Sequence, residues 1–177
     1  GGVRADGDAD REAPLEIRPG TTGHPDKQDA HMEKGYLALI LHAHLPYVRH
    51  PEYKSFLEED WLFEAITETY VPLIRVLQRL TRDGVEFRLT LSLSPPLVAM
   101  LEDPLLQERY LKHISGLVEL TEKEIDRAKA EPRLRRVAEM YHSFFSDVRR
   151  VFADEYGLDL VQAFRDFLDR GKIELMT

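Results

Sequence analysis

Two histidines separated by a single residue, His42 and His44, are the side chains in this sequence best placed to do chemistry. They follow directly on an apolar run from Tyr36 to Leu41. Side chains at positions i and i+2 of a strand point in the same direction, so an extended segment would project both imidazoles together. Parallel α/β folds bind ligands at the carboxyl ends of their strands. The spacing therefore predicts a pair of ligand-binding imidazoles at the end of a first strand.

Two other interpretations of this pair stay open on the residues alone. Imidazole pairs are good zinc ligands, and many metal-dependent hydrolases also begin with a His-x-His pair after their first barrel strand. Such a site needs a third and a fourth ligand from later strands, and the sequence has no further cluster of that kind. Alternatively, His42 and His44 are partly buried and only cap local backbone groups.

Two segments have the pattern of strands that could position the pair. Residues 35–41 are continuously apolar, as in a parallel strand that is covered on both faces. Residues 85–94 alternate between apolar and polar, which has the period of a strand. We expect the odd-numbered leucines of the first strand to face helices, which leaves the interior of a barrel to Ala38, Ile40, His42 and His44. By the same alternation, the second strand turns inward Thr90, Ser92 and Ser94.

The remaining elements are predicted to be mostly helical. Residues 61–80 have helical spacing, with Asp60 as a candidate N-cap and a kink or break at Pro72. A long helical stretch follows Asp103-Pro104 and restarts at Pro132. A last helix spans residues 158–170, and residues 172–177 begin a third strand. The order predicts an α/β fold with parallel strands. We expect the helix after Pro132 to bury an apolar stripe made of Leu134, Val137, Tyr141, Phe144, Val148 and Phe152.

Composition restricts the classes of partner. The chain has 177 residues, of which 32 are acidic and 24 basic, for a net charge of −8. This charge repels phosphate backbones, so we expect no nucleic-acid partner. No apolar run approaches the ~20 residues of a membrane helix, so we expect no membrane partner. The absence of cysteine excludes disulfides and thiolate chemistry and fits a cytoplasmic location.

The two ends of the chain differ in character. Residues 1–31 are rich in Gly, Asp, Arg and Pro and contain few apolar side chains, so we expect a disordered tail there. We expect the folded unit to cover residues 32–177, starting at Met32. The strand that begins near Lys172 suggests that this unit is a fragment of a longer domain.

Three segments together form a specific pattern. The first is His42-Ala43-His44-Leu45-Pro46-Tyr47-Val48-Arg49, the second covers residues 61–73, and the third covers residues 89–97. They resemble the first conserved region, the following helix and the second strand of glycoside hydrolase family 57, and above all of its branching-enzyme members. The resemblance runs from Met32 to the end of the chain.

This resemblance implies a fold and an activity. The family's catalytic domain is a (β/α)₇ barrel with helices inserted after the second strand, so the chain would supply the first strands and helices of an incomplete barrel. Members act on α-1,4-glucans or maltooligosaccharides with retention and need no metal or organic cofactor. The expected activity is that of a 1,4-α-glucan branching enzyme, with α-amylase or 4-α-glucanotransferase as alternatives. Retention requires two carboxylates ~5–5.5 Å apart. The family's nucleophile and acid/base would both lie beyond Thr177, so the chain alone is expected to be inactive.

The resemblance also implies which residues contact the glucan. His42 and His44 would bind sugar hydroxyls near the scissile bond, because neutral imidazoles donate hydrogen bonds. Tyr47 and Trp61 are candidates for stacking against sugar rings, although Trp61 is also a candidate core residue. Ser94 is the candidate on the second strand. The acidic run at residues 58–60 is interpreted as a solvated loop and helix start.

Overall fold

The structure, a computed structural model, describes residues 35–176. Residues 37–177 form one compact unit, which holds every helix and strand described below. The tail predicted over residues 1–31 lies outside the described residues. Within residues 35–176, no helix is both long enough and apolar enough to cross a membrane.

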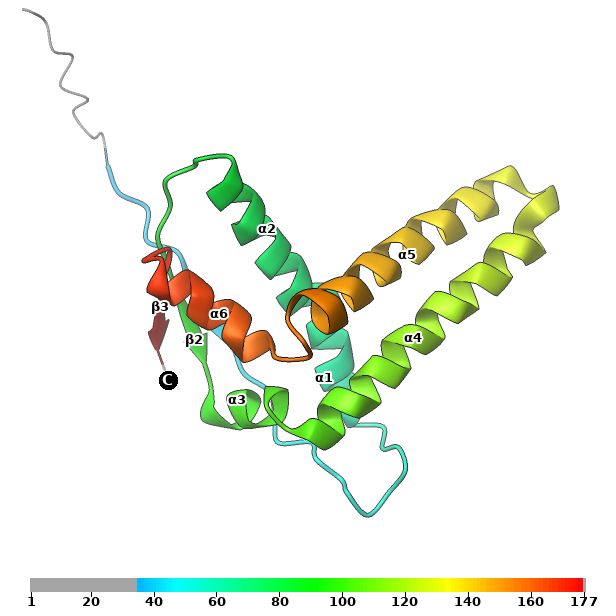
Figure 1. Ribbon diagram of the computed structural model, residues 1–177, viewed down its shortest axis with the longest axis horizontal. Helices are drawn as coiled ribbons and strands as arrows, with labels where there is room; N and C mark the ends of the chain where they lie inside the picture. The colour runs from blue at the N-terminus through cyan, green and yellow to red at the C-terminus, as the bar shows by residue number, and fades with distance from the viewer. Residues whose placement is uncertain (1–34, 177) are drawn as a thin grey trace, which may run out of the picture. The chain divides into compact units, whose positions relative to one another are not determined.

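Three short strands form a parallel sheet in the order β1-β2-β3, and helices join them (Figure 1). The strands are β1 (Ile40–Ala43), β2 (Leu89–Leu93) and β3 (Ile173–Met176). His42 lies opposite Ser92 in the register, and Ser92 lies opposite Met176. The prediction of an α/β fold with parallel strands is therefore confirmed for this part of the chain.

The first strand begins five residues later than the sequence predicted. Residues 35–39 are not in a strand, and Leu37 is 89% exposed rather than buried. The reason is that helices cover only the end of β1 near Leu41 and Ala43, the two residues that pack into the core. The prediction that Leu37 and Leu39 face helices is thus wrong. The second strand is also shorter than predicted, because pairing begins only at Leu89.

A long helical segment follows the first strand and changes its geometry midway. It consists of α1 (Glu59–Ala65), a π-helical turn η1 (Ile66–Tyr70) and α2 (Val71–Arg82). Pro72 has no N–H to donate to the carbonyl four residues earlier, and a π-helical turn accommodates such a lost bond. The break predicted at Pro72 therefore takes the form of a wider turn just before it. Asp60 is not the N-cap, since the helix already includes Glu59 and starts without a side-chain cap.

The chain between β2 and β3 is helical throughout. A helix not predicted from the sequence, α3 (Pro95–Leu101), starts directly after β2, because prolines at the first helical positions pre-set the backbone. Two long helices then form an antiparallel hairpin that extends away from the sheet (Figure 1). They are α4 (Pro104–Arg127) and α5 (Pro132–Arg150), joined by the 3₁₀ turn η2 (Ala128–Ala130). A second π-helical turn, η3 (Val151–Glu155), and α6 (Leu160–Asp169) lead back to β3.

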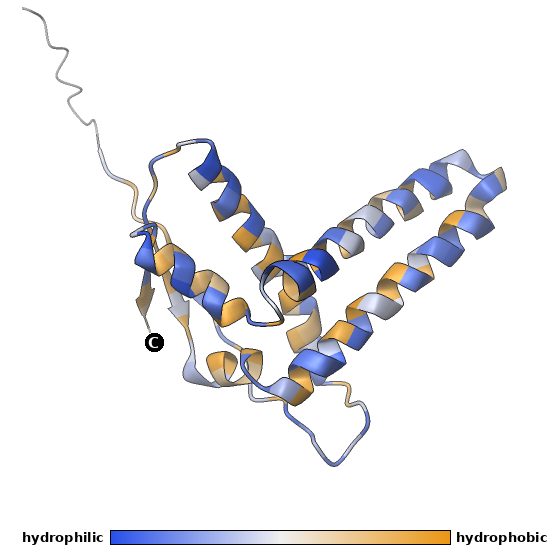
Figure 2. Cartoon of the chain, viewed as in Figure 1, coloured by the Kyte–Doolittle hydropathy of each residue, from blue (hydrophilic) through white to orange (hydrophobic). Residues whose placement is uncertain are grey.

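The core lies where these helices meet the covered face of the sheet, and apolar residues concentrate there (Figure 2). Tyr110 of α4 is fully buried at its centre, with its ring edge-on to Phe152 at 4.7 Å between centroids. Its hydroxyl makes a hydrogen bond of 2.9 Å with the hydroxyl of buried Thr67. Burial raises the pKa of Tyr110 far above its usual range. The first half of α4 is thereby locked to the helix that follows β1.

The far half of the α4–α5 hairpin is less buried than the sequence predicted. Phe144 packs against the core, and Val148 and Phe152 are buried within it, whereas Tyr141 is 46% exposed. Leu134 and Val137 are exposed as well, so the prediction of a fully buried stripe is wrong for three of its six residues. This half extends past the other described helices, which leaves an apolar groove of about 380 Å³ between α4 and α5.

Asp103 links the start of α4 to the segment after β1. One of its carboxylate oxygens accepts hydrogen bonds from the N–H groups of Leu105 and Leu106 at 3.0 and 3.1 Å, and the other accepts one from Arg49 at 2.5 Å. We predict that Asp103→Ala lowers the free energy of unfolding by about 1–2 kcal/mol in urea denaturation, because the helix loses its cap. Asp103→Asn should cost less, since an amide oxygen can still cap. Equal losses in the two variants would contradict this account.

His113 on α4 gives a prediction on pH. Its ring lies 5.2 Å from the ring of Phe63, and burial lowers its pKa despite the nearby carboxylates of Asp60 and Glu64. The folded chain therefore favours the neutral imidazole, and this contribution is complete above the unfolded pKa of about 6.5 and is lost as the pH falls below it. We predict that stability measured by thermal melts between pH 7 and 5 falls less steeply in His113→Gln than in the unmodified chain. Parallel pH profiles would rule out a role for His113.

Candidate functional site

His42 lies on the face of the sheet that no described helix covers. Its neighbours Leu41 and Ala43 pack into the core on the opposite face, so strand alternation turns the exposed imidazole outward. The register places Ser92 beside it on β2 and Met176 beyond that on β3. These three side chains form one row across the carboxyl half of the uncovered face.

His44 and Ser94 lie just past the ends of β1 and β2. The N–H of Ser94 donates to the carbonyl of Ala43 at 3.1 Å, which holds the two strand ends together. His44 is exposed, as the predicted role requires. The Ser94 hydroxyl is buried, and it has no hydrogen-bond partner among the described residues. The Ser94 hydroxyl is therefore covered, whereas His42 and His44 are both exposed.

A carboxylate on the uncovered face was missed in the sequence analysis. Glu174 of β3 is exposed and lies opposite Thr90, which in turn lies opposite Ile40. The signal that could have identified it is the alternation of β3, in which Ile173 and Leu175 face the core and leave Glu174 on the same face as His42. The uncovered face thus combines imidazole, hydroxyl and carboxylate groups. These are the donors and acceptors that a polyhydroxylated ligand needs.

Exposed aromatic residues occupy the segment after β1 and the first turn of α1. Tyr47 is 57% exposed and Trp61 50%, so the structure places both at the surface and not in the core. Tyr53, which the sequence analysis did not single out, is exposed to a similar degree. Its ring stacks on Phe56 at 4.9 Å between centroids, and Phe56 contacts the ring of His50 at 3.8 Å. An aromatic residue within a polar loop was the signal available for Tyr53.

Glu59 contradicts the prediction of a solvated acidic run. Its side chain is 1% exposed and forms an ion pair with Arg109 of α4, which is itself only 14% exposed. The guanidinium of Arg109 also donates to the carbonyls of His50 and Tyr53. Burial of a carboxylate is tolerated here because a charged partner and a second donor, the N–H of His50, satisfy it.

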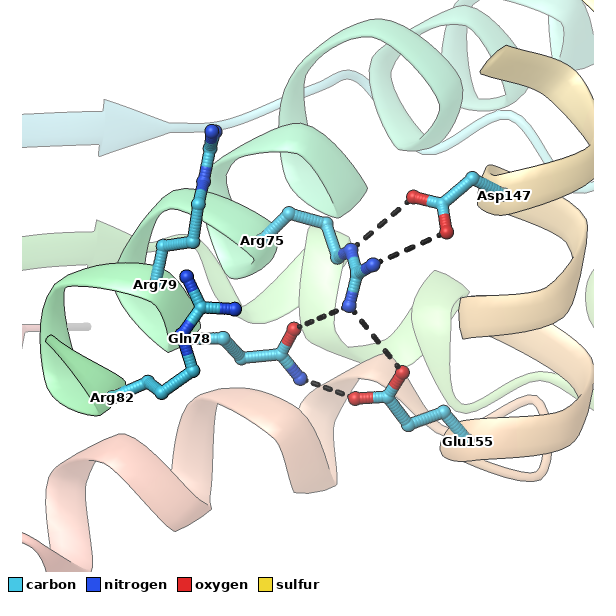
Figure 3. A pocket seen from close by; sticks show the side chains of 6 residues that line it. All are labelled: Arg75, Gln78, Arg79, Arg82, Asp147 and Glu155. Atoms are coloured by element: carbon cyan, nitrogen blue, oxygen red, sulfur yellow. Dashed lines mark hydrogen bonds and ion pairs between the residues drawn. The ribbon is translucent and has the colours of Figure 1, made fainter. Parts of the chain in front are cut away.

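A polar pocket between α2 and α5 has a different character (Figure 3). It has a volume of about 610 Å³, and Arg75 donates to both carboxylate oxygens of Asp147 at 3.2 Å. The same guanidinium donates to Gln78 at 3.1 Å and forms an ion pair with Glu155 at 3.7 Å. Polar groups of α2, α5 and the turn η3 thus satisfy one another at the centre of this pocket. No lining residue comes from the sheet or from the segment after β1, so we do not assign this pocket to ligand binding.

Metal ligands were the rival interpretation of the two histidines. Within residues 35–176, no group of three or more His, Cys, Asp or Glu side chains is arranged to hold a metal ion. A site built on His42 and His44 would therefore need ligands from outside the described residues.

Curated proteins with related sequences include α-glucan branching enzymes. The chain is 31% identical over 146 residues to the 1,4-alpha-glucan branching enzyme TK1436 of Thermococcus kodakarensis. The aligned region covers 81% of this chain and 21% of that protein. It is 34% identical over 70 residues to a probable 1,4-alpha-glucan branching enzyme of Mycobacterium tuberculosis, covering 40% of this chain and 13% of that protein. The chain thus spans about a fifth or less of the length of these relatives.

Solved structures agree with the fold. The α-amylase AmyC of Thermotoga maritima is similar with a TM-score of 0.73 and 45% identity, over 79% of this chain and 26% of that one. The branching enzyme of Pyrococcus horikoshii is similar with a TM-score of 0.75 and 34% identity, over 82% of this chain and 27% of that one. The sequence profile of glycosyl hydrolase family 57 matches residues 38–177. The chain therefore belongs to glycosyl hydrolase family 57.

Proposed function

We propose that this chain is the N-terminal portion of a retaining, α-glucan-active enzyme, and that the enzyme is a 1,4-α-glucan branching enzyme. The observation that carries the proposal is the position of His42 on the uncovered face, in one row with Ser92 of β2 and near the carboxyl end of parallel strands. This is the edge at which parallel α/β folds bind substrates. The branching enzymes among the relatives supply the choice of reaction.

In this proposal the described residues bind the glucan and do not break its bond. The imidazoles of His42 and His44 exchange hydrogen bonds with sugar hydroxyls, and the carboxylate of Glu174 accepts from further hydroxyls. Tyr47 and Trp61 offer exposed ring faces on which the C–H face of a glucose unit can stack. We assign no direct contact to Ser94, because its hydroxyl is covered.

The bond chemistry is proposed to reside in the rest of the enzyme. A retaining mechanism uses one carboxylate to attack the anomeric carbon and a second to protonate the leaving oxygen and then to activate the acceptor hydroxyl. The solved relatives extend well beyond the part that this chain matches, since it covers 26–27% of them. We place both carboxylates there, together with the strands that complete a (β/α)₇ barrel in which α3, α4 and α5 are the helical insertion after the second strand.

Hydrolysis is the second candidate activity. The identity to the α-amylase AmyC, 45%, exceeds the 34% identity to the branching-enzyme structure of Pyrococcus horikoshii. Both reactions begin with the same cleavage of an α-1,4 bond and differ in whether water or a sugar hydroxyl takes the glucosyl unit. An α-amylase would release reducing ends without forming branches, a 4-α-glucanotransferase would form new α-1,4 bonds, and a branching enzyme would form α-1,6 bonds.

The binding role of the histidines can be tested on this chain by titration with maltoheptaose, followed by calorimetry. We predict that His42→Ala and His44→Ala each weaken binding roughly five- to tenfold, as expected for the loss of one or two hydrogen bonds worth about 1 kcal/mol each. Glu174→Gln should weaken binding by a similar factor. The control is His142→Ala on α5, whose imidazole pairs with Glu122 on the hairpin and should not affect affinity. Unchanged affinity in both strand-end variants would refute the proposal, and tightly bound stoichiometric zinc that requires His42 would favour the metal-dependent hydrolase.

Because the proposal places both catalytic carboxylates outside this chain, we predict that the chain alone forms no branches. Incubation with amylose should leave no α-1,6 linkages for a debranching enzyme to cleave, because neither proposed catalytic carboxylate is part of the chain. The control is a characterised branching enzyme of this family under the same conditions. Detection of new branches with the 177-residue chain would place the catalytic groups among the residues described here.

A further inference from the structure

The Glu59–Arg109 ion pair connects three parts of the chain that are far apart in sequence. Glu59 belongs to the first turn of α1, Arg109 to the second turn of α4, and the loop between His50 and Tyr53 lies against both. The side chain of Glu59 is 1% exposed, so the carboxylate of the pair is shielded from water. Removing two charges from water is costly, and it is tolerated only where the pair is well hydrogen-bonded.

The hydrogen bonds of the pair go to the backbone of this loop. The carboxylate oxygen of Glu59 that receives Arg109 also accepts the N–H of His50 at 3.3 Å. One guanidinium nitrogen of Arg109 donates to the carbonyl of His50 at 3.2 Å, and another donates to the carbonyl of Tyr53. No strand within residues 35–176 pairs with the loop, so these side chains provide the bonds that a sheet would otherwise provide. A lysine could not replace them, because a compact ammonium lacks the planar fork of donors.

The same loop carries exposed aromatic side chains. The Phe56 ring contacts the rings of both His50 and Tyr53, and Tyr53 is 52% exposed. Trp61 follows Glu59 by two residues in the first turn of α1. The ion pair therefore sets the position of the loop and of the helix start that presents Trp61.

We propose that Arg109 and Glu59 are positioning residues of the glucan-binding site, which fix the aromatic loop at residues 50–56 and Trp61 in the conformation that a glucan chain stacks on. The inference rests on the proposed function and extends it from the strand-end histidines to a second, aromatic region. It gives α4 a part in binding, since Arg109 reaches the loop from that helix. Neither Arg109 nor Glu59 needs to touch the sugar.

The test compares local order with global stability in Arg109→Lys, which keeps the charge and loses the fork. We expect cooperative unfolding with a moderate loss of stability. The N–H of His50 is bonded to Glu59, and the N–H of Tyr53 donates to the carbonyl of His50 at 3.3 Å. Hydrogen exchange at these two N–H groups should accelerate at least tenfold, and acrylamide should quench the fluorescence of Trp61, the single tryptophan, more strongly. Maltoheptaose affinity should fall roughly tenfold. The control, Arg135→Lys, alters an exposed ion pair with Glu139 on the hairpin and should change none of these readings.

A second variant tests the inference in case Arg109→Lys does not fold. Glu59→Gln combined with Arg109→Met removes both charges together, so that no unpaired charge is left buried, and it should show the same loop and binding changes in a folded chain. Unchanged exchange and quenching in either folded variant would overturn the inference, as would a loosened loop with unchanged affinity. If the unmodified chain does not bind maltoheptaose, the proposed function fails, and the exchange and quenching measurements still decide whether the pair positions the loop.

Discussion

The sheet is covered by helices on one face among the described residues, and most of the arrangement follows from this constraint. Leu41, Ala43, Leu91 and Leu93 pack toward the helices, so strand alternation leaves His42 and Ser92 on the uncovered face. Burial on one side thus orients the polar groups on the other. The parallel register then aligns them across three strands that are separated in sequence by dozens of residues.

The helices between β2 and β3 do more than cover the sheet. The cap residue of α4, Asp103, binds Arg49 just after the histidine segment, and Arg109, in the second turn of the same helix, binds the next loop. Both contacts pair a charge on α4 with the segment after β1. The base of the α4–α5 hairpin, which extends away from the sheet, is thereby attached to the edge where the ligand is proposed to bind. Its outer half carries the apolar groove and is not needed for this anchoring.

The sequence predicted those features that depend on local pattern. Periodicity identified the main helices, and Asp103-Pro104 and Pro132 marked helix starts correctly. The side of the sheet on which His42 lies, opposite the helices, followed from the alternation of the first strand. Features that depend on long-range packing were missed. The burial of Glu59 requires Arg109, which is fifty positions away. No pattern in the sequence around Glu59 indicates that Arg109 is its partner. Leu37 and Tyr141 were expected to be buried because they are apolar, but whether a helix covers them is decided by the length and direction of distant elements.

The π-helical turn at Ile66–Tyr70 has a geometric consequence for the helix that carries Trp61. Each residue of an α-helix turns the side-chain direction by about 100° around the axis. The extra residue of a π turn therefore rotates the side chains before the turn relative to those after it. Leu62 and Ile74 both reach the core, although the helix changes phase between them. A regular helix built from the same residues would rotate one of these two faces away from the sheet, and Trp61 would turn with its half. The orientation of the indole is therefore coupled, through one widened turn, to the packing of a helix that ends more than twenty residues later.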